Sequence, residues 1–262
     1  MGASITFIEP ALRDALQADG LARYEDFLGC DRGELVAAGG SCETRRLALD
    51  EGGAAREYYL KRYRYAAGRG RLRARMDKAE REARNYAYLR NVCGVDVPDV
   101  VCFGIRSRLW RRRDGFILTR GVARALPLDA HVANRWPRSG GGYSDLERRA
   151  LFNAACDLLR KMHDNHFYHL DLQWRNILVK DTCRLYVLDS SKGGPRRSRV
   201  FQEHGRLRDL SSLAKEAIVR LSRTERMRWL RQYLGVGRLG EAQRMMIRAI
   251  ERDRVLKDNS DR

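Results

Sequence analysis

One feature of the second half of the chain constrains its fold most: four polar residues at fixed spacing, set between short apolar runs. His169 and Asp171 are separated by one residue, Asn176 follows five positions after Asp171, and Asp189 stands thirteen positions further on. Because a tight loop followed by a hairpin brings its two ends together, we expect Asp171, Asn176 and Asp189 to converge. Two short apolar runs favour such a hairpin: NILV (176–179) and RLYVLD (184–189).

This spacing suits the transfer of a phosphoryl group. One carboxylate must meet the acceptor hydroxyl, while an amide oxygen and a second carboxylate hold Mg²⁺ against the phosphates. The layout matches the catalytic loop H-x-D-x-x-x-x-N and the later metal-binding Asp of protein-kinase-like phosphotransferases. The alternative is an exposed loop with incidental acids. The Asn at the fifth position and the Asp at the end of an apolar run favour the phosphotransferase interpretation.

The same hypothesis requires a lysine on a strand and a glutamate on the helix that follows. Lys61 lies on an alternating segment beside Tyr59 and Tyr63, and its expected role is to hold the α- and β-phosphates of the nucleotide. Glu82 is the preferred partner of Lys61, because apolar residues surround its face of the predicted helix. Glu80 is the competitor, but two positions away on a helix it points elsewhere.

Ala38-Gly39-Gly40-Ser41 is the candidate turn that covers the phosphates. Two adjacent glycines allow the backbone to approach a phosphate closely. The full G-x-G-x-x-G pattern is absent, so an ordinary hairpin turn is an equal alternative.

The pattern of the whole chain changes from strand-like to helical. Residues 11–29 indicate one or two short helices, and a helix is expected over 71–90. Alternation and turn residues predict a small sheet from these segments: 34–38, 44–49, 57–63, 98–105 and 115–119. We therefore predict an α+β fold with helices and a sheet-rich lobe over 1–121, followed by a helical lobe over 122–262.

Two helices are expected in the second lobe. Apolar residues recur at helical spacing over 147–163 and again over 209–221, where Asp209 would serve as the N-cap.

Charge is the most unusual bulk property. Among 262 residues, Lys and Arg number 52 against 34 Asp and Glu, which gives a net charge of +18 and an isoelectric point near 10.2. Such a surplus implies anionic partners: nucleic acid, an anionic membrane face or phosphorylated substrates. The cluster RRSR (196–199) lies just past Asp189, near where an acceptor would enter. No nucleic-acid-binding motif accompanies the charge, so no nucleic acid partner is expected.

The remaining composition points to a globular cytoplasmic protein. No apolar stretch approaches the roughly 18 residues of a membrane-spanning helix, and MGASITFIEP does not read as a secretory signal. The six cysteines are scattered without a C-x-x-C pair, so we expect reduced thiols and neither a disulfide framework nor a zinc site.

With these motifs in view, the sequence resembles the bacterial lipopolysaccharide core kinases, which phosphorylate Kdo or heptose sugars and belong to the protein-kinase-like superfamily. The resemblance runs from about residue 35 to 218. It rests on six segments: LKRYR (60–64), REARNYAYLR (81–90), VDVPDVVCFG (95–104), HLDLQWRNILV (169–179), LDSSKGG (188–194) and RLRDLSSLAK (206–215).

The resemblance implies a bilobal protein-kinase-like fold, ATP and Mg²⁺ as cofactors, and a role for each motif residue. Asp171 would be the catalytic base, His169 would brace the loop, and Asn176 and Asp189 would hold magnesium. Lys61 and Glu82 would order the phosphates under the turn of Gly39, Gly40 and Ser41. Backbone groups near Thr119 to Val122 would contact adenine. Asp209 would tie the catalytic loop to the next helix, and His163 would be structural.

It also implies a partner and a location. The expected acceptor is a sugar hydroxyl of the lipopolysaccharide core, reached by a protein that sits peripherally on the cytoplasmic face of the inner membrane. Two alternatives remain: a protein or aminoglycoside-like acceptor for the same chemistry, and a basic nucleic-acid-binding pseudokinase. Leu170, Gln173 and Ser190-Ser191 depart from regulated protein kinases, and no A-P-E segment follows Asp189. A basic role for Arg175 or Lys192 stays open.

Overall fold

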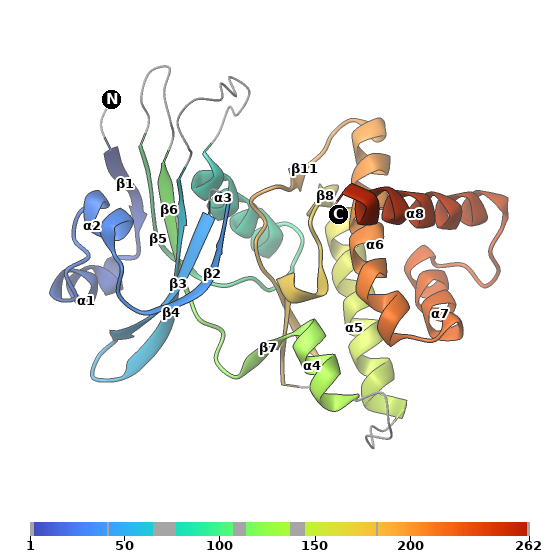
Figure 1. Ribbon diagram of the computed structural model, residues 1–262, viewed down its shortest axis with the longest axis horizontal. Helices are drawn as coiled ribbons and strands as arrows, with labels where there is room; N and C mark the ends of the chain where they lie inside the picture. Colours follow the sequence, from blue (N-terminus) through green and yellow to red (C-terminus); the bar gives the residue numbers. More distant parts are fainter. Residues whose placement is uncertain are drawn as a thin grey trace. The chain divides into compact units, whose positions relative to one another are not determined.

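The structure is a computed structural model that describes residues 3–40, 42–64, 77–106, 114–136, 145–181 and 183–260. The chain divides into two compact units (Figure 1). Unit 1 consists of Met1–Ala87 and Pro98–Ala123, and unit 2 consists of Tyr88–Val97 and Arg124–Arg262. The chain therefore enters unit 2 briefly, returns to unit 1, and then completes unit 2.

Unit 1 is built on an antiparallel sheet of six strands in the order β1-β5-β6-β4-β3-β2. Its strands are β1 (Ala3–Ile8), β2 (Glu34–Gly39), β3 (Cys42–Asp50), β4 (Ala55–Tyr63), β5 (Val100–Arg106) and β6 (Gly115–Arg120). In β4, Tyr58 and Leu60 are buried in the core, whereas Tyr59 and Lys61 are only partly buried. Because successive side chains of a strand face opposite sides, Lys61 lies on the face away from the core.

The core of unit 1 forms where short helices cover one face of this sheet. These are η1 (Pro10–Leu12), α1 (Arg13–Ala18) and α2 (Tyr24–Gly29). The Phe27 ring of α2 stacks on Phe116 of β6 with 4.2 Å between ring centroids, and Leu12 and Leu16 are buried in the same cluster. Because these side chains are buried under the helices on one face of the sheet, a binding site in unit 1 would have to lie on the opposite face.

Helix α3 (Lys78–Asn91) belongs to both units, since the boundary falls between Ala87 and Tyr88. The sequence predicts a helix over 71–90. The structure begins that helix at Lys78, and residues 71–76 lie outside the described residues.

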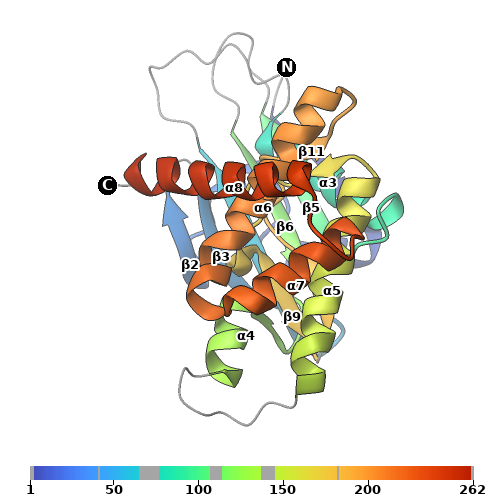
Figure 2. The ribbon, with the colours of Figure 1, turned by 90° about the vertical axis from the view of Figure 1, so that its right-hand side faces the viewer.

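Unit 2 is mainly helical. Its helices are α4 (Leu128–Arg135), α5 (Asp145–Asp164), α6 (Arg199–Arg220), α7 (Arg223–Leu234) and α8 (Glu241–Ser260). Helix α7 contacts α5, and α8 packs across α6 (Figure 2).

Short strands connect these helices. A three-stranded sheet has the order β10-β9-β7, and a second pair joins β11 to β8. Their bounds are β7 (Ala125–Pro127), β8 (Phe167–Tyr168), β9 (Ile177–Lys180), β10 (Arg184–Val187) and β11 (Gly194–Pro195). A 3₁₀ turn, η2 (Trp174–Asn176), precedes β9, so the predicted hairpin is present as β9 and β10.

The predicted order of a sheet-rich part followed by a helical part is confirmed. One prediction is wrong in its boundary: the helix expected to begin at Asp209 begins ten residues earlier, at Arg199. Asp209 is therefore not an N-cap. It lies in the middle of α6 and is fully buried. Strand β1 was not predicted, because an edge strand that pairs with distant β5 has little local signal.

Candidate active site

The loop between β8 and η2 carries His169 and Asp171, and Asp209 of α6 holds its backbone. The amides of His169 and Leu170 donate to the two carboxylate oxygens of Asp209, at 2.8 and 2.7 Å. Leu170 has a φ of +64°, a left-handed conformation that L-residues seldom adopt. Two charge-assisted hydrogen bonds from a buried carboxylate stabilise this conformation and so position Asp171.

The Asp209 carboxylate is itself fixed by a buried network. His163 at the end of α5 places its Nε2 3.2 Å from Asp209 Oδ2 and its Nδ1 2.7 Å from the hydroxyl of Tyr233. A carboxylate only accepts, so Nε2 is the donor in the contact with Asp209. This arrangement connects α5, α6 and α7 beneath the loop. Tyr233 was not among the residues predicted from the sequence.

Backbone and side-chain hydrogen bonds bring Asn176 and Asp189 to the same loop. Asn176 Nδ2 donates to the Asp171 carbonyl at 2.8 Å, and the amide of Leu188 donates to the Asn176 carbonyl at 2.8 Å. His169 Nε2 lies 2.8 Å from the Leu188 carbonyl. Asp189 is the next residue, and Ser191 Oγ donates to its Oδ1 at 3.2 Å.

Asp171 lies in a polar setting that favours its ionised form. Lys192 Nζ donates to Oδ2 at 2.6 Å, and Gln173 Nε2 donates to Oδ1 at 3.0 Å. Burial alone would raise the pKa of Asp171, but the hydrogen bond and charge of Lys192, together with Gln173, lower it below the ordinary 3.8. Asp171 is therefore a carboxylate at neutral pH, as a group that accepts a hydroxyl proton must be.

In unit 1, Lys61 contacts Glu82. Lys61 Nζ donates to Glu82 Oε1 at 3.2 Å, and the hydroxyls of Tyr63 and Tyr86 also donate to this carboxylate. Glu82 is almost fully buried, so these donors compensate for its loss of solvation. Glu80, the competing candidate, instead bonds Arg84 at 2.6 Å on the exposed side of α3.

The glycine turn lies at the end of β2. Gly39 pairs with Cys42 in the β2–β3 ladder, and Gly40 has a φ of +55°. A Cβ built on either glycine would meet no atom within 4 Å, so the described surroundings leave room for a ligand. Ser41, the third predicted residue of this turn, lies outside the described residues.

The segment predicted to contact adenine begins within β6 and continues past its end. Thr119 pairs with Tyr59 of β4 within the sheet. The amide of Gly121 donates to the Glu57 carbonyl at 2.7 Å, and Val122 comes next. Thr119 and Val122 therefore belong to unit 1, as do Lys61 and the two glycines.

The donors near Asp171 fit magnesium better than a softer metal. Among the described residues, no three His, Cys, Asp or Glu side chains form a group that could hold a metal alone. Asn176 uses its amide nitrogen toward Asp171, so its Oδ1 is the atom that would face an ion, and Asp189 supplies a carboxylate. One or two oxygen ligands completed by phosphates and waters are what Mg²⁺ prefers.

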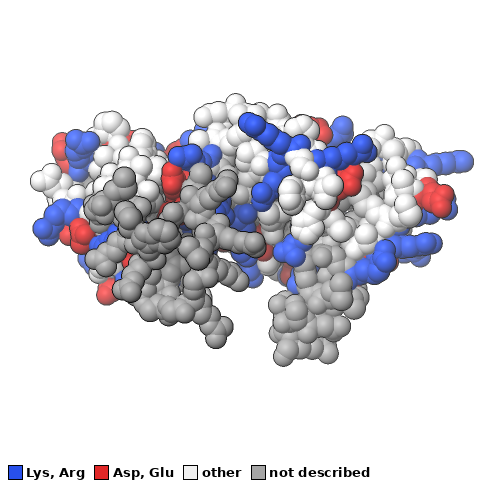
Figure 3. All heavy atoms as spheres, turned by 90° about the horizontal axis from the view of Figure 1, so that it is seen from above, with Lys and Arg blue, Asp and Glu red and all other residues white. Residues whose placement is uncertain are grey.

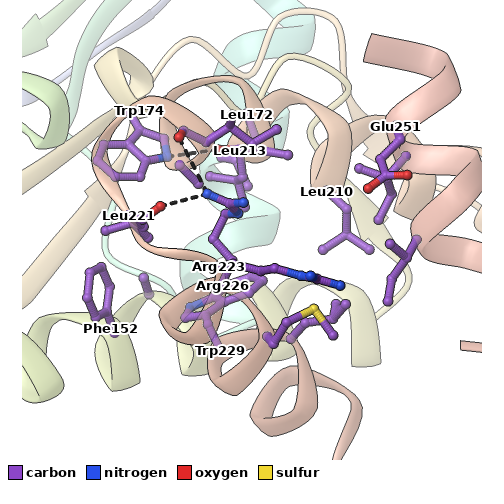
Figure 4. A pocket seen from close by; sticks show the side chains of 18 of the residues that line it. Phe152, Leu172, Trp174, Leu210, Leu213, Leu221, Arg223, Arg226, Trp229 and Glu251 are labelled. Atoms are coloured by element: carbon purple, nitrogen blue, oxygen red, sulfur yellow. Dashed lines mark hydrogen bonds between the residues drawn. The ribbon is translucent and has the colours of Figure 1, made fainter. Parts of the chain in front are cut away.

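Unit 2 also holds an apolar cavity that the sequence did not predict. Its volume is about 500 Å³, and α4 to α8 and η2 supply its walls (Figure 4). Phe152, Trp174, Leu210 and Leu213 line it, and Trp174 Nε1 donates to the Leu213 carbonyl at 3.0 Å. Helical spacing predicts that such side chains are buried, but it gives no sign that the helices leave space between them.

None of the helices in the described stretches of the chain is both long enough and apolar enough to cross a bilayer.

Comparisons with known proteins bear on the family and the fold of the chain. The model of the lipopolysaccharide kinase (Kdo/WaaP) family matches residues 37–233. A solved structure, WaaP in complex with acyl carrier protein, is similar to this chain with a TM-score of 0.69 and 22% sequence identity, covering 95% of this chain and 97% of that one. No curated protein matches the sequence. The structural likeness confirms the predicted kinase-like fold, in which an antiparallel sheet precedes the helices.

Proposed function

Because the chain belongs to the lipopolysaccharide kinase (Kdo/WaaP) family, we propose that it transfers the γ-phosphoryl group of ATP to a hydroxyl of Kdo or heptose in the lipopolysaccharide inner core. Membership of the family makes the protein a phosphotransferase. The sugar acceptor, the cofactors and the role of each residue are the parts that we propose.

The observation that carries the proposal is the clustering of Asp171, Asn176 and Asp189 around one loop. Asp171 would orient the acceptor hydroxyl and take its proton as the oxygen bonds to the γ-phosphorus, while the bond from that phosphorus to the β-phosphate oxygen breaks and ADP leaves. Asn176 and Asp189 would hold Mg²⁺, which neutralises charge on the phosphates. His169 would brace the loop through the Leu188 carbonyl.

Unit 1 would supply the contacts to the rest of the nucleotide. Lys61, steadied by Glu82, would hold the α- and β-phosphates. The backbone of Gly39 and Gly40 would approach the phosphates, with Ser41 beside them, and backbone groups from Thr119 to Val122 would bind adenine.

A glycolipid acceptor fits the chain better than a protein acceptor. Ser190 and Ser191 stand where protein kinases carry Phe-Gly, and both are buried, with Ser191 bonded to Asp189. Because the segment after Asp189 is buried and hydrogen-bonded, it does not resemble the activation loop of a regulated protein kinase. The nucleic-acid-binding pseudokinase is disfavoured, because every residue that the chemistry needs is present.

Phosphate transfer to purified core oligosaccharide from ATP tests the proposal. Asp171→Asn should abolish transfer while the unfolding transition stays close to that of the wild type. Asp181→Asn, a change at an exposed turn of the same unit, is the matched control and should retain full activity. Full activity of the Asp171 variant would rule out the mechanism. Transfer to proteins or aminoglycosides, but not to the core oligosaccharide, would contradict the assignment of a sugar acceptor.

We further propose that the protein lies peripherally on an anionic membrane surface, on the cytoplasmic face of the inner membrane. Val200 and Phe201 at the start of α6 are 71% and 63% exposed, and Arg196, Arg197 and Arg199 directly precede them in sequence. Blue side chains project at several points from the face in Figure 3, which looks onto the molecule from above. Each such cation near an anionic bilayer adds about 1 kcal/mol of attraction.

Sedimentation with vesicles tests this surface. The wild type should bind vesicles rich in phosphatidylglycerol, weakly at high salt, and should not bind neutral phosphatidylcholine vesicles. Val200→Ser with Phe201→Ser should reduce binding without reducing activity on water-soluble core oligosaccharide. Val219→Ser, an exposed residue of the same helix, is the control. Unchanged binding of the double variant would contradict the assignment.

A second partner is supported by the cavity of unit 2. The similar WaaP structure contains acyl carrier protein, and we propose that this chain also binds an acyl carrier protein and accepts its acyl chain in the cavity. A volume of about 500 Å³ is within the range of ligand pockets, and each buried CH₂ contributes about 0.8 kcal/mol.

A bulky substitution tests this partner. Ala217→Trp would fill part of the cavity and should weaken binding of acylated carrier protein more than binding of the unacylated form. Val219→Trp, two positions along the same helix but 57% exposed, should leave both affinities unchanged. Equal binding of acylated and unacylated carrier by the wild type would exclude the cavity as the acyl site.

A further inference from the structure

Lys192 is the cation that touches the proposed catalytic carboxylate. Its Nζ lies 2.6 Å from Asp171 Oδ2, and its side chain is 63% exposed while that of Asp171 is 16% exposed. The ammonium therefore stands on the open side of Asp171, where an acceptor and a phosphoryl group would have to arrive.

The backbone that carries Lys192 is fixed against the catalytic loop. A Cβ on the next residue, Gly193, would lie 2.4 Å from the Tyr168 carbonyl and 2.8 Å from the His169 carbonyl, so only glycine fits this approach. Gly194 then pairs with Tyr168 in the β11–β8 ladder. A side chain mounted on such a segment keeps a defined position relative to Asp171.

The site needs a cation that the loop itself does not supply. Phosphoryl transfer spreads negative charge over the oxygens of the transferred group, and a positive side chain in place beforehand stabilises that charge. Gln173, two residues after Asp171, is neutral and uses its amide to fix Asp171 Oδ1. Arg175 is exposed, and in the described part of the chain no bond from it to Asp171 is found.

We propose that Lys192 is a catalytic residue that contacts the transferred phosphoryl group; this inference rests on the proposed kinase function. In the structure its ammonium holds Asp171 Oδ2. When the γ-phosphate arrives, the ammonium turns to the phosphoryl oxygens and remains protonated. Oδ2 is then open to the acceptor hydroxyl, whose proton passes to Asp171 as the new O–P bond forms and ADP leaves.

Binding of a phosphoryl mimic tests this role without an acceptor. Calorimetry would compare ADP with Mg²⁺ alone and ADP with Mg²⁺ and aluminium fluoride, which imitates the transferred group. Lys192→Ala should weaken the fluoride complex at least tenfold and leave the affinity for ADP alone unchanged. Lys192→Arg should restore part of the difference, and Lys180→Ala on β9 should behave like the wild type.

Kinetics give the second readout. Lys192→Ala should lower kcat roughly 10²- to 10³-fold, the usual effect of losing one charge-stabilising donor, with little change in the KM for ATP. Equal loss of affinity for ADP alone would contradict the proposal, as would a fluoride complex as tight as that of the wild type. If the protein binds the mimic through Lys192 but does not phosphorylate core sugars, the acceptor assignment fails while this role stands.

Discussion

Asp209 shows how one buried side chain can set the geometry of a loop. Its carboxylate is fully buried and accepts two backbone amides and His163, so every one of these donors depends on it. Leu170 keeps a positive φ, and the hydrogen bond from its amide to Asp209 stabilises this rarely adopted conformation.

Asp209→Ala should therefore lower the free energy of unfolding by about 2–4 kcal/mol, because it leaves buried donors unsatisfied. Phosphate transfer should fall with it, since the loop that carries Asp171 loses its anchor. Urea unfolding measures the first effect. Tyr233→Phe removes only the hydroxyl at the far end of the network and should cost about 1 kcal/mol. Equal stability of Asp209→Ala and the wild type would contradict this role.

At the residue scale, spacing along the chain predicts which side chains meet, but not what surrounds them. Asp171, Asn176 and Asp189 lie within eighteen positions of one another, with a local turn and hairpin between them. Asp209 was assigned to a helix start, because the apolar periodicity begins there. The preceding turns of α6 expose Val200 and Phe201, so periodicity alone could not locate them on the helix.

At the element scale, the packing of α6 on β8 depends on one glycine. A Cβ on Gly205 would lie 2.5–2.8 Å from side-chain atoms of Tyr168, which is fully buried and directly precedes the catalytic loop. Glycine weakens helix propensity, which is a second reason why the sequence did not predict this part of α6.

Gly205→Ala should destabilise the protein by about 1–3 kcal/mol through overpacking, even though alanine favours helix. Thermal unfolding would show a lower Tm for this variant. Gly237→Ala, at a position where a Cβ meets no atom within 4 Å, is the control and should leave the Tm nearly unchanged. A higher Tm for Gly205→Ala would mean that propensity outweighs the contact with Tyr168.

The ends of helix α7 could have been predicted from residues close to them in the sequence. Helix α7 begins with a capping box in which Ser222 and Glu225 exchange hydrogen bonds, and it ends at Gly235 with a φ of +66°. Ser-x-x-Glu before a helix and glycine after it are recognisable in sequence. Strand β1 and the β8–β11 pair lack such marks, because their partners are far along the chain.

At the scale of the whole molecule, stability should fall in acid from two sources. Arg62 and Arg45 outweigh burial and lower the pKa of Glu43 from 4.5, and Arg184 lowers that of Asp96 from 3.8. The unfolded chain takes up these protons first as the pH falls. Stability from these carboxylates is therefore complete above their ordinary pKa values and is lost as the pH drops through the folded ones.

His131 should also make the stability of the protein depend on pH, in a range above that of the two carboxylates. Burial, and then Arg135, lower its pKa below 6.5, so between the two values the unfolded chain binds a proton that the folded chain does not. Stability should decrease as the pH falls from 6.5. Urea unfolding at pH 7.5 and 5.5 should show a smaller decrease for His131→Gln than for the wild type. His204→Gln, an exposed residue, should match the wild type; the same result for His131→Gln would contradict the assignment.

The cavity lined by α4 to α8 leaves unit 2 less tightly packed than a solid helical bundle. Space that the apolar walls keep free of water is lost on unfolding, so hydrostatic pressure should unfold unit 2 at lower values than it would a solidly packed bundle. High-pressure fluorescence of Trp174 and Trp229, which line the cavity, would follow the transition. A long-chain fatty acid that occupies the space should raise the midpoint pressure, whereas a short, charged carboxylate should not.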